Sequence, residues 1–319
     1  MFGLKELKST IAVDANSVEC PVVACRQRVE RQRKTFLRQE RFQCPDHGIF
    51  ISPSTFEYPS EKDNLLWTTP SDEDLRAAIK SVKRESRMAR DNSEDAVTWN
   101  VFRYLDVCGH LDRWLSGVTQ RTCRNAELTY WSYSHKASGA LLELNEAREE
   151  FGEDLERSSE PDLIAVTDTT LFFIETKVCA ANNTLPSDPG KRKKYLTGGD
   201  VWHARVFRSD FDAVAIGARK YELFRFWLLG TWMAARMKKE FYLLNVVLAS
   251  REAEIEGQLG QHIRTDDGRH FLRVTWEDVH GFIARTAPPD DARQSMANYF
   301  QNKTIGYGQD RILRKAFDV

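Results

Sequence analysis

Three side chains in the middle of the sequence have the types and spacing of a hydrolytic site that uses a metal ion. Asp162 precedes the apolar run Leu163–Val166, and Glu175 and Lys177 follow a second apolar run, Leu171–Ile174. Residues two apart in a strand project from the same face, so Glu175 and Lys177 should lie side by side. Carboxylates hold divalent ions, and an ammonium group stabilises the charge of a reacting phosphate.

The turn between the two runs decides how the acids face each other. If its loop has two or four residues centred between Asp168 and Thr169, the register places Asp162 opposite Glu175. A three-residue loop would break this register. Opposed side chains have Cβ atoms about 4.5–5.5 Å apart, and two carboxylates at that distance repel by roughly 3 kcal/mol at an effective dielectric of about 20. We therefore expect Mg²⁺ or Mn²⁺ at this pair, where it would polarise a phosphodiester while Lys177 orients water or neutralises charge.

A second set of metal ligands lies near the N-terminus. Cys20 and Cys25 are separated by four residues, Cys44 and His47 by two, and eighteen residues separate the two pairs. Thiolate and imidazole ligands in two pairs suit tetrahedral zinc, and structural zinc would explain how 60 residues without an obvious core fold. The alternative is a pair of partly buried free thiols and an unrelated His47. The other three cysteines show no paired spacing.

Charge is unevenly distributed along a chain of net charge −1. Residues 26–41 hold seven Arg or Lys against two Glu, and residues 143–162 hold nine Asp or Glu against two Arg. The net charge excludes a protein that coats nucleic acid by bulk charge, whereas the basic block predicts a local grip on phosphates through Arg31, Arg33 and Lys34. The alternative is that both blocks are solvated helix faces.

A long loop, Ala180–Asp200, is expected directly after the second strand, where long loops tend to be functional. Four consecutive cations in it are predicted to contact the substrate backbone, the alternative being a solvated loop. They are Lys191, Arg192, Lys193 and Lys194.

The elements that must position these groups follow from periodicity. We expect helices over about 72–90, 93–106, 139–151 and 217–239, strands over 127–134, 163–166, 171–174, 241–249 and 270–276, and a further helix before a C-terminal tail. This order predicts a mixed α/β fold in which helices flank the sheet. We divide the chain into a zinc-binding module (1–60), a linker with a basic helix (61–90) and a catalytic domain (91–319).

Over about 91–250 these residues resemble the PD-(D/E)xK, or restriction-endonuclease-like, nucleases. Pro161-Asp162 matches the PD element, and Glu175-Thr176-Lys177 matches (D/E)xK. The resemblance implies a restriction-endonuclease-like core with a central mixed sheet, and an acid on the preceding helix that joins the metal site. Glu94 is the matching position, with Asp95 as the alternate. The N-terminal Cys/His pattern is similar to a zinc-ribbon-like module of CCCH type.

The sequence therefore predicts an Mg²⁺-dependent endonuclease, acting foremost on DNA in a defence or repair setting. A second hypothesis is a zinc-containing nucleic-acid adaptor that does not cleave, and a third is an interaction protein whose acidic block 143–160 docks a basic partner. A cut in both strands would suit a homodimer. No apolar run reaches the length of a membrane span, and the first residues lack a secretory signal pattern, so we expect a cytoplasmic location.

Overall fold

The computed structural model describes residues 1–33, 35–83, 87–134, 139–155, 160–188, 190, 192–266 and 268–319. They form two compact units: unit 1 comprises Met1–Asp72, Glu85–Cys108 and Trp276–Val319, and unit 2 comprises Glu73–Arg84 and Gly109–Thr275. These boundaries differ from the division expected at residues 60 and 90, and the functional division into three parts stays a prediction.

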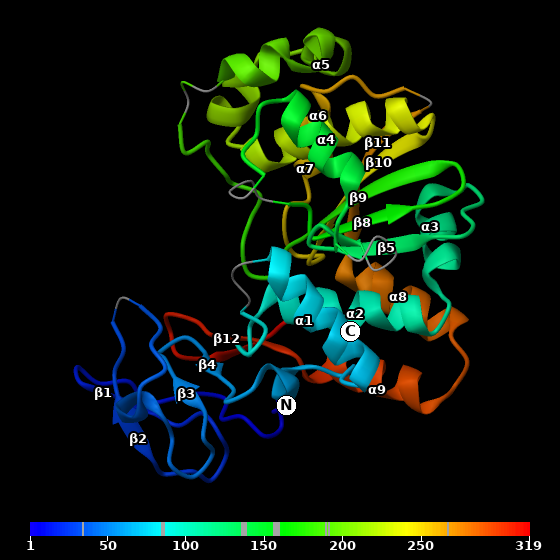
Figure 1. Cartoon of the computed structure of the whole chain (residues 1–319). Helices are drawn as coiled ribbons and strands as arrows, with labels where there is room; N and C mark the ends of the chain where they lie inside the picture. Colours follow the sequence, from blue (N-terminus) through cyan, green and yellow to red (C-terminus); the bar gives the residue numbers. More distant parts are fainter. Residues whose placement is uncertain are drawn as a thin grey trace. The chain divides into compact units, whose positions relative to one another are not determined.

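Unit 2 is built on a seven-stranded mixed sheet (Figure 1), in the order β11-β10-β9-β8-β5-β6-β7. Its strands are β5 (Glu127–Tyr130), β6 (Tyr133–Ser134), β7 (Gly139–Ala140), β8 (Leu163–Val166), β9 (Thr170–Thr176), β10 (Glu240–Val247) and β11 (Arg269–Thr275). Strands β9, β10 and β11 are parallel neighbours, whereas β8 pairs antiparallel with both β9 and β5. The mixed α/β class is confirmed.

Helices flank this sheet. Those of unit 2 are α3 (Leu111–Thr119), α4 (Leu142–Glu150), α5 (Arg192–Val206), α6 (Tyr221–Met237) and α7 (Ile255–Gly260), with a π-helical segment Asp212–Gly217; α1 (Pro70–Val82) contains the boundary between the units. Helices α4, α5 and α6 share a hydrophobic core with one face of β8, β9 and β10, to which the alternating residues Leu171 and Phe173 of β9 contribute. Glu175 continues this alternation, so its side chain projects from the same face of the sheet as Leu171 and Phe173, the face that α6 covers.

Gly230 allows α6 to pack closely on β10. A Cβ atom built at Gly230 would lie 2.2 Å from the ring of Phe241. We expect Gly230→Ala to lower the free energy of unfolding by about 1–3 kcal/mol, because the close-packed ring cannot yield without strain. Urea denaturation measures this. Gly257→Ala in α7 is the matched control, since its Cβ would meet no atom within 4 Å, and it should be neutral or stabilising. Equal effects of the two substitutions would contradict the packing argument.

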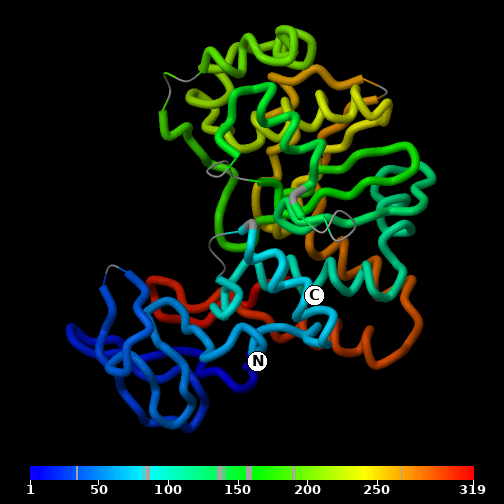
Figure 2. The backbone as a smooth tube through the Cα atoms, viewed as in Figure 1, coloured from blue at the N-terminus to red at the C-terminus, as the bar shows by residue number. Residues whose placement is uncertain are grey.

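Unit 1 joins both ends of the chain. It contains β1 (Ser17–Glu19), β2 (Arg28–Glu30), β3 (Phe50–Ile51), β4 (Phe56–Glu57), β12 (Thr304–Tyr307), β13 (Leu313–Lys315), α2 (Glu94–Val107), α8 (Trp276–Thr286), α9 (Asp291–Asn302) and 3-10 helices at Glu40–Phe42 and Glu61–Asn64. The C-terminal segment runs beside the N-terminal one (Figure 2), and Leu313 N donates to Ser9 O at 2.8 Å. The expectation of a mere C-terminal tail was wrong, because that segment forms α9 and the β12–β13 hairpin.

A buried ion pair links distant parts of unit 1. Lys303 Nζ lies 3.8 Å from Asp91 Oδ1, and each side chain is 1% exposed. Lys303 Nζ also donates to Asn64 Oδ1 at 3.1 Å. Lys303→Met should lower the free energy of unfolding by about 3–5 kcal/mol, since it leaves a buried carboxylate without its counter-charge. Adding Asp91→Asn should restore most of this loss in urea denaturation; a double variant no more stable than the single one would refute the pairing.

Several element predictions are confirmed. Helix α2 begins after Ser93, whose side chain accepts a hydrogen bond from Ala96 N at 3.1 Å. The expected strands at 163–166, 171–174, 241–249 and 270–276 correspond to β8, β9, β10 and β11, and the helix at 217–239 corresponds to α6.

Other predictions were wrong in their bounds. The strand expected over 127–134 is two strands, because Trp131 and Ser132 have φ of 44° and 67° and reverse the chain between β5 and β6. Alternating side chains do not reveal such a turn. The helix expected over 72–90 ends at Val82, and the helix expected over 139–151 begins only at Leu142.

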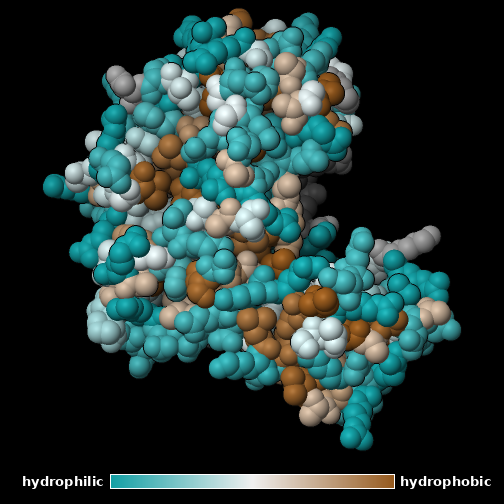
Figure 3. Space-filling view, turned by 180° about the vertical axis from the view of Figure 1, so that it is seen from behind, coloured by the Kyte–Doolittle hydropathy of each residue, from teal (hydrophilic) through white to brown (hydrophobic). Residues whose placement is uncertain are grey.

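The described residues contain no helix whose length and hydropathy would allow it to cross a bilayer. On the face of the molecule seen in Figure 3 the surface is mostly hydrophilic, with hydrophobic residues in small patches.

Candidate functional site

The β8–β9 hairpin has the register that the sequence predicts. Leu163 pairs with Ile174, and the turn is closed by a hydrogen bond from Thr167 N to Thr170 O at 2.9 Å. Continuing this antiparallel register by one residue places Asp162 opposite Glu175. The conditional argument about the turn is therefore confirmed.

Three donors orient the carboxylate of Asp162. Thr176 donates to Oδ2 through its backbone N at 2.9 Å and its hydroxyl at 2.7 Å, and Trp131 Nε1 donates to Oδ1 at 3.1 Å. The turn between β5 and β6 brings Trp131 here, and Trp131 N also donates to Asp162 O at 2.9 Å. Asp162 itself is partly exposed, whereas Glu175 is buried.

Glu175 and Lys177 form an ion pair that is largely buried. Lys177 Nζ donates to Glu175 Oε1, and the two side chains are 14% and 4% exposed. The two side chains therefore do not form an exposed surface ion pair. Burial raises the pKa of Glu175 well above its usual value, and the nearby charge of Asp162 raises it further. A carboxylate in this setting binds a proton or a cation readily.

Lys177 faces several carboxylates at once. Its Nζ lies 3.5 Å from Glu222 Oε2, and burial alone would lower the pKa of Lys177. The charges of Glu175, Asp162 and Glu222 outweigh burial and raise this pKa above its usual value. The amine therefore stays charged, as a group that neutralises a phosphate must.

Sequence reasoning missed Glu222. It stands in the first turn of α6, where its backbone N donates to Thr184 Oγ1 at 2.9 Å. An acid in a first helical turn has an ordinary explanation in the helix dipole, and Glu222 follows Lys177 by 45 residues. No spacing signal connects the two.

Asn245 was also missed. It is the Cα partner of Glu175 on β10, so the two side chains share a face, and it is completely buried. Asn182 Nδ2 donates to Asn245 Oδ1 at 2.8 Å and to Glu252 Oε2 at 2.6 Å. Within the described part of the chain, the Nδ2 atom of Asn245 has no hydrogen-bond partner. A row of polar groups from Asp162 through Glu175 to Asn245 thus crosses three strands of an otherwise apolar face.

Glu160 lies just before the hairpin and is partly buried. Its Oε2 is 3.7 Å from Arg148 Nη2, and its side chain is 20% exposed. Burial raises the pKa of Glu160. Its pairing with the buried Arg148 of α4 gives it a structural explanation.

Glu94 was predicted as a third acid of the site. It lies in the first turn of α2 and belongs to unit 1, whereas the hairpin belongs to unit 2. Its role, and that of the alternate Asp95, stays a prediction. Among the residues described, the acids of the hairpin are not part of any group of three or more potential ligands that converge on one point.

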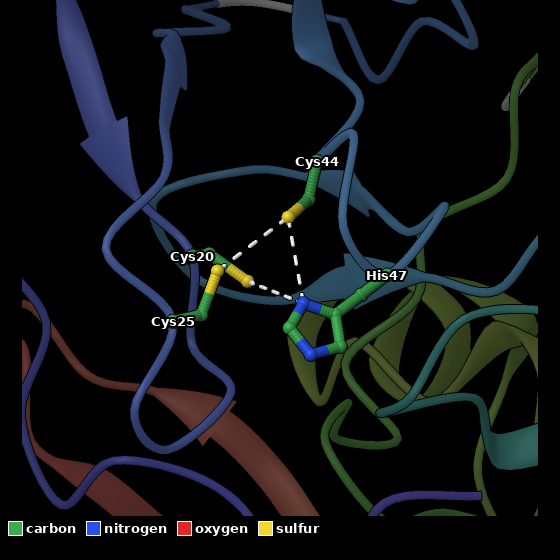
Figure 4. Close-up of side chains that lie close together, drawn as sticks. All are labelled: Cys20, Cys25, Cys44 and His47. Atoms are coloured by element: carbon green, nitrogen blue, oxygen red, sulfur yellow. Dashed lines mark hydrogen bonds between the residues drawn. The ribbon is translucent and has the colours of Figure 1, made fainter.

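The N-terminal ligands do converge. Cys20, Cys25, Cys44 and His47 place four ligand atoms within 4.8 Å of one another, as Figure 4 shows. Sγ of Cys25 and Cys44 are 3.7 Å apart, and His47 Nδ1 is 3.5 Å from Cys44 Sγ and 3.8 Å from Cys20 Sγ. With zinc bonds of about 2.3 Å to sulfur and 2.0–2.1 Å to nitrogen, a tetrahedron has edges of about 3.8 Å and 3.5 Å. The separations fit a metal ion held by all four residues.

The segment around this cluster has a core of its own, contrary to expectation. Cys20, Cys25 and Cys44 pack among buried apolar side chains that include Phe56 and, from the C-terminal hairpin, Tyr307. Burial raises the pKa of the Cys20 and Cys44 thiols. A bound cation would lower these pKa values, because it stabilises the thiolate form. A metal would therefore reinforce a core that already exists. The alternative of an unrelated His47 is wrong.

The cations predicted to grip phosphates near the N-terminus are partly engaged within unit 1. Arg31 Nη1 donates to Asp14 O at 3.1 Å, and Arg33 Nη2 donates to Ala15 O at 2.8 Å. Lys34 lies outside the described residues. A guanidinium has five N–H donors, so these contacts leave donors for a phosphate.

The cations after β9 were expected in a loop. The described ones lie at the start of α5 instead. Arg192 pairs with Asp212, Lys193 is exposed, and Lys194 Nζ donates to Gly152 O at 3.2 Å. Lys191 lies outside the described residues. The predicted loop 180–200 was wrong from Arg192 onward, where α5 begins. The backbone leaves helical φ and ψ from Gly198 to Val201, so α5 is broken by a kink at the two glycines.

Comparison with protein-family models, with curated proteins and with solved structures gave no match to this chain.

Proposed function

We propose that the protein is a Mg²⁺-dependent nuclease that hydrolyses phosphodiester bonds, foremost in DNA. The observation that supports the proposal is the grouping of Asp162, Glu175 and Lys177 at one end of the adjacent strands β8 and β9, whose register, continued by one residue, puts the two acids opposite each other. Two carboxylates and a protonated amine are what phosphodiester hydrolysis with a divalent ion needs.

Each side chain has a defined part in this chemistry. A divalent ion held by Asp162 and Glu175 would stabilise charge on the phosphate and lower the pKa of a bound water. Thr176 and Trp131 fix the direction of the Asp162 carboxylate. The ammonium of Lys177 can donate to a phosphate oxygen as negative charge grows on it. The oxygen of water forms a bond to phosphorus and loses one proton, the bond from phosphorus to the leaving deoxyribose oxygen breaks, and that oxygen takes up one proton, so the protons balance.

The resemblance of Pro161-Asp162 and Glu175-Thr176-Lys177 to PD-(D/E)xK nucleases supports the same proposal, together with the restriction-endonuclease-like arrangement that it implies. A defence or repair setting is analogy at the level of the fold. The competing function, an adaptor that binds without cleaving, is favoured by one observation: Lys177 already neutralises Glu175.

The N-terminal cluster would serve as a structural zinc site in a module that helps to hold nucleic acid. All four positions are taken by protein side chains, as in structural rather than catalytic zinc sites. A cytoplasmic location would suit it, since the six cysteines form no disulfide. A homodimer would suit cleavage of both strands.

The test is incubation of the full, zinc-loaded chain with plasmid DNA, single-stranded DNA and RNA, with Mg²⁺, with Mn²⁺ or with EDTA. We expect breakage that depends on the added metal and that Asp162→Ala and Lys177→Ala each abolish while the protein stays folded. Binding without cleavage under every metal would support the adaptor instead.

A further inference from the structure

The ammonium of Lys177 occupies the place where a metal ion would reach Glu175. Its Nζ donates to Glu175 Oε1, one of the two oxygens by which that carboxylate could bind a cation. The backbone beside it is fixed, because Lys177 N donates to Val246 O at 2.8 Å. An ion arriving at Asp162 and Glu175 therefore competes with this ammonium for the same oxygen, and the two cations repel each other.

The displaced ammonium needs another acceptor close by. The Lys177 side chain is only 14% exposed, and a buried charge without a partner is strongly unfavourable. Glu222 Oε2 already lies 3.5 Å from Nζ, and the Glu222 side chain is 20% exposed. It can thus keep the ammonium while Glu175 turns to the ion.

The placement of Glu222 is independent of the hairpin. It comes from the first turn of α6, and its backbone N donates to Thr184 Oγ1 at 2.9 Å. Thr184 N in turn donates to Arg219 O at 2.8 Å, which ties the segment after β9 to the start of α6. The backbone that carries Glu222 is therefore held in place independently of the partner that Glu175 takes.

We infer that Glu222 is the positioning residue of Lys177: it retains the ammonium when a divalent ion takes Glu175, so that metal and ammonium are present together. This inference rests on the proposed function of the hairpin. Glu222 acts through Lys177 and is not itself a ligand of the ion, in keeping with the absence of a third convergent acid among the described residues.

The experiment measures Mn²⁺ affinity by calorimetry on the full, zinc-loaded chain, with Asp162→Ala as the reference for loss of the site. Glu222→Gln should weaken Mn²⁺ binding about tenfold, since the ammonium then stays on Glu175. In a Lys177→Met background, Glu222→Gln should leave the affinity unchanged. Glu222→Asp, which keeps the charge, should bind within about threefold of wild type. Glu240→Gln is the matched control, because Glu240 pairs with Arg121 at the other end of β10.

The Mn²⁺ affinities of these variants distinguish a positioning role of Glu222 from direct coordination of the ion. Equal weakening by Glu222→Gln with and without Lys177 would make Glu222 a direct ligand and overturn the inference, as would no weakening in either background. In both cases the proposed function stands if wild type binds Mn²⁺ and cleaves. A wild-type chain that binds no more Mn²⁺ than Asp162→Ala would overturn the metal site and the inference together. Thermal unfolding of each variant separates these effects from a lost fold.

Discussion

Glu175→Gln should cleave DNA at least about a thousandfold more slowly than the wild-type chain, with its free energy of unfolding changed by no more than about 1–2 kcal/mol. A thousandfold loss corresponds to about 4 kcal/mol of transition-state stabilisation, which is what the loss of a bound divalent ion would remove. Single-turnover cleavage with Mg²⁺ measures the rate.

The fold should survive because glutamine keeps the shape of the side chain. Its Oε1 still accepts from Lys177 Nζ, and the buried charge next to Asp162 disappears. Glu240→Gln, a substitution of the same kind at an exposed ion pair on β10, should leave cleavage unchanged. If Glu175→Gln cleaves at the wild-type rate, the hairpin is not the catalytic site.

The same substitution has a pH signature. Burial raises the folded-state pKa of Glu175 above the ordinary value of 4.5, so without added divalent ion the folded chain holds this proton more tightly than the unfolded chain. The contribution of Glu175 to the free energy of unfolding is therefore largest below the unfolded-state pKa. It is lost as the pH rises through the folded-state pKa. The stability of Glu175→Gln relative to wild type should therefore increase with pH above about 4.5, as urea denaturation at several pH values can show.

Cys44→Ser should abolish metal binding at the N-terminal cluster and lower the free energy of unfolding of unit 1 by at least about 3 kcal/mol. Structural zinc contributes its binding free energy to folding, about 10–16 kcal/mol in small zinc modules. The loss here should be smaller than that range, because Cys44 sits in an apolar core that reaches as far as Tyr307. Elemental analysis gives the zinc content, and limited proteolysis of residues 1–60 shows which part of the chain opens.

Cys108→Ser is the matched control. Cys108 is a partly buried free thiol at the end of α2, outside the cluster, so its substitution should leave one zinc per chain. A Cys44→Ser chain that keeps its full zinc content would contradict the site, whatever happens to its stability.

The sequence by itself determined the features that depend on residues close together in the chain: the register of the β8–β9 hairpin and the ligands of the N-terminal cluster. The turn Thr167–Thr170 and the two apolar runs fix the register of β8 and β9, because hairpin pairing follows from loop length and alternation. The spacing of Cys20, Cys25, Cys44 and His47 likewise predicted a cluster that the structure brings together.

Only the tertiary structure decided which distant groups surround the hairpin. Glu222 reaches Lys177 because α6 crosses the sheet, and Asn245 lies beside Glu175 because β10 pairs in parallel with β9. The turn at Trp131 that supplies a donor to Asp162 depends on positive φ angles, which the alternation of side chains conceals. Local periodicity specifies an element and its faces, but the packing of whole elements selects which faces meet, and no spacing within the chain records that choice.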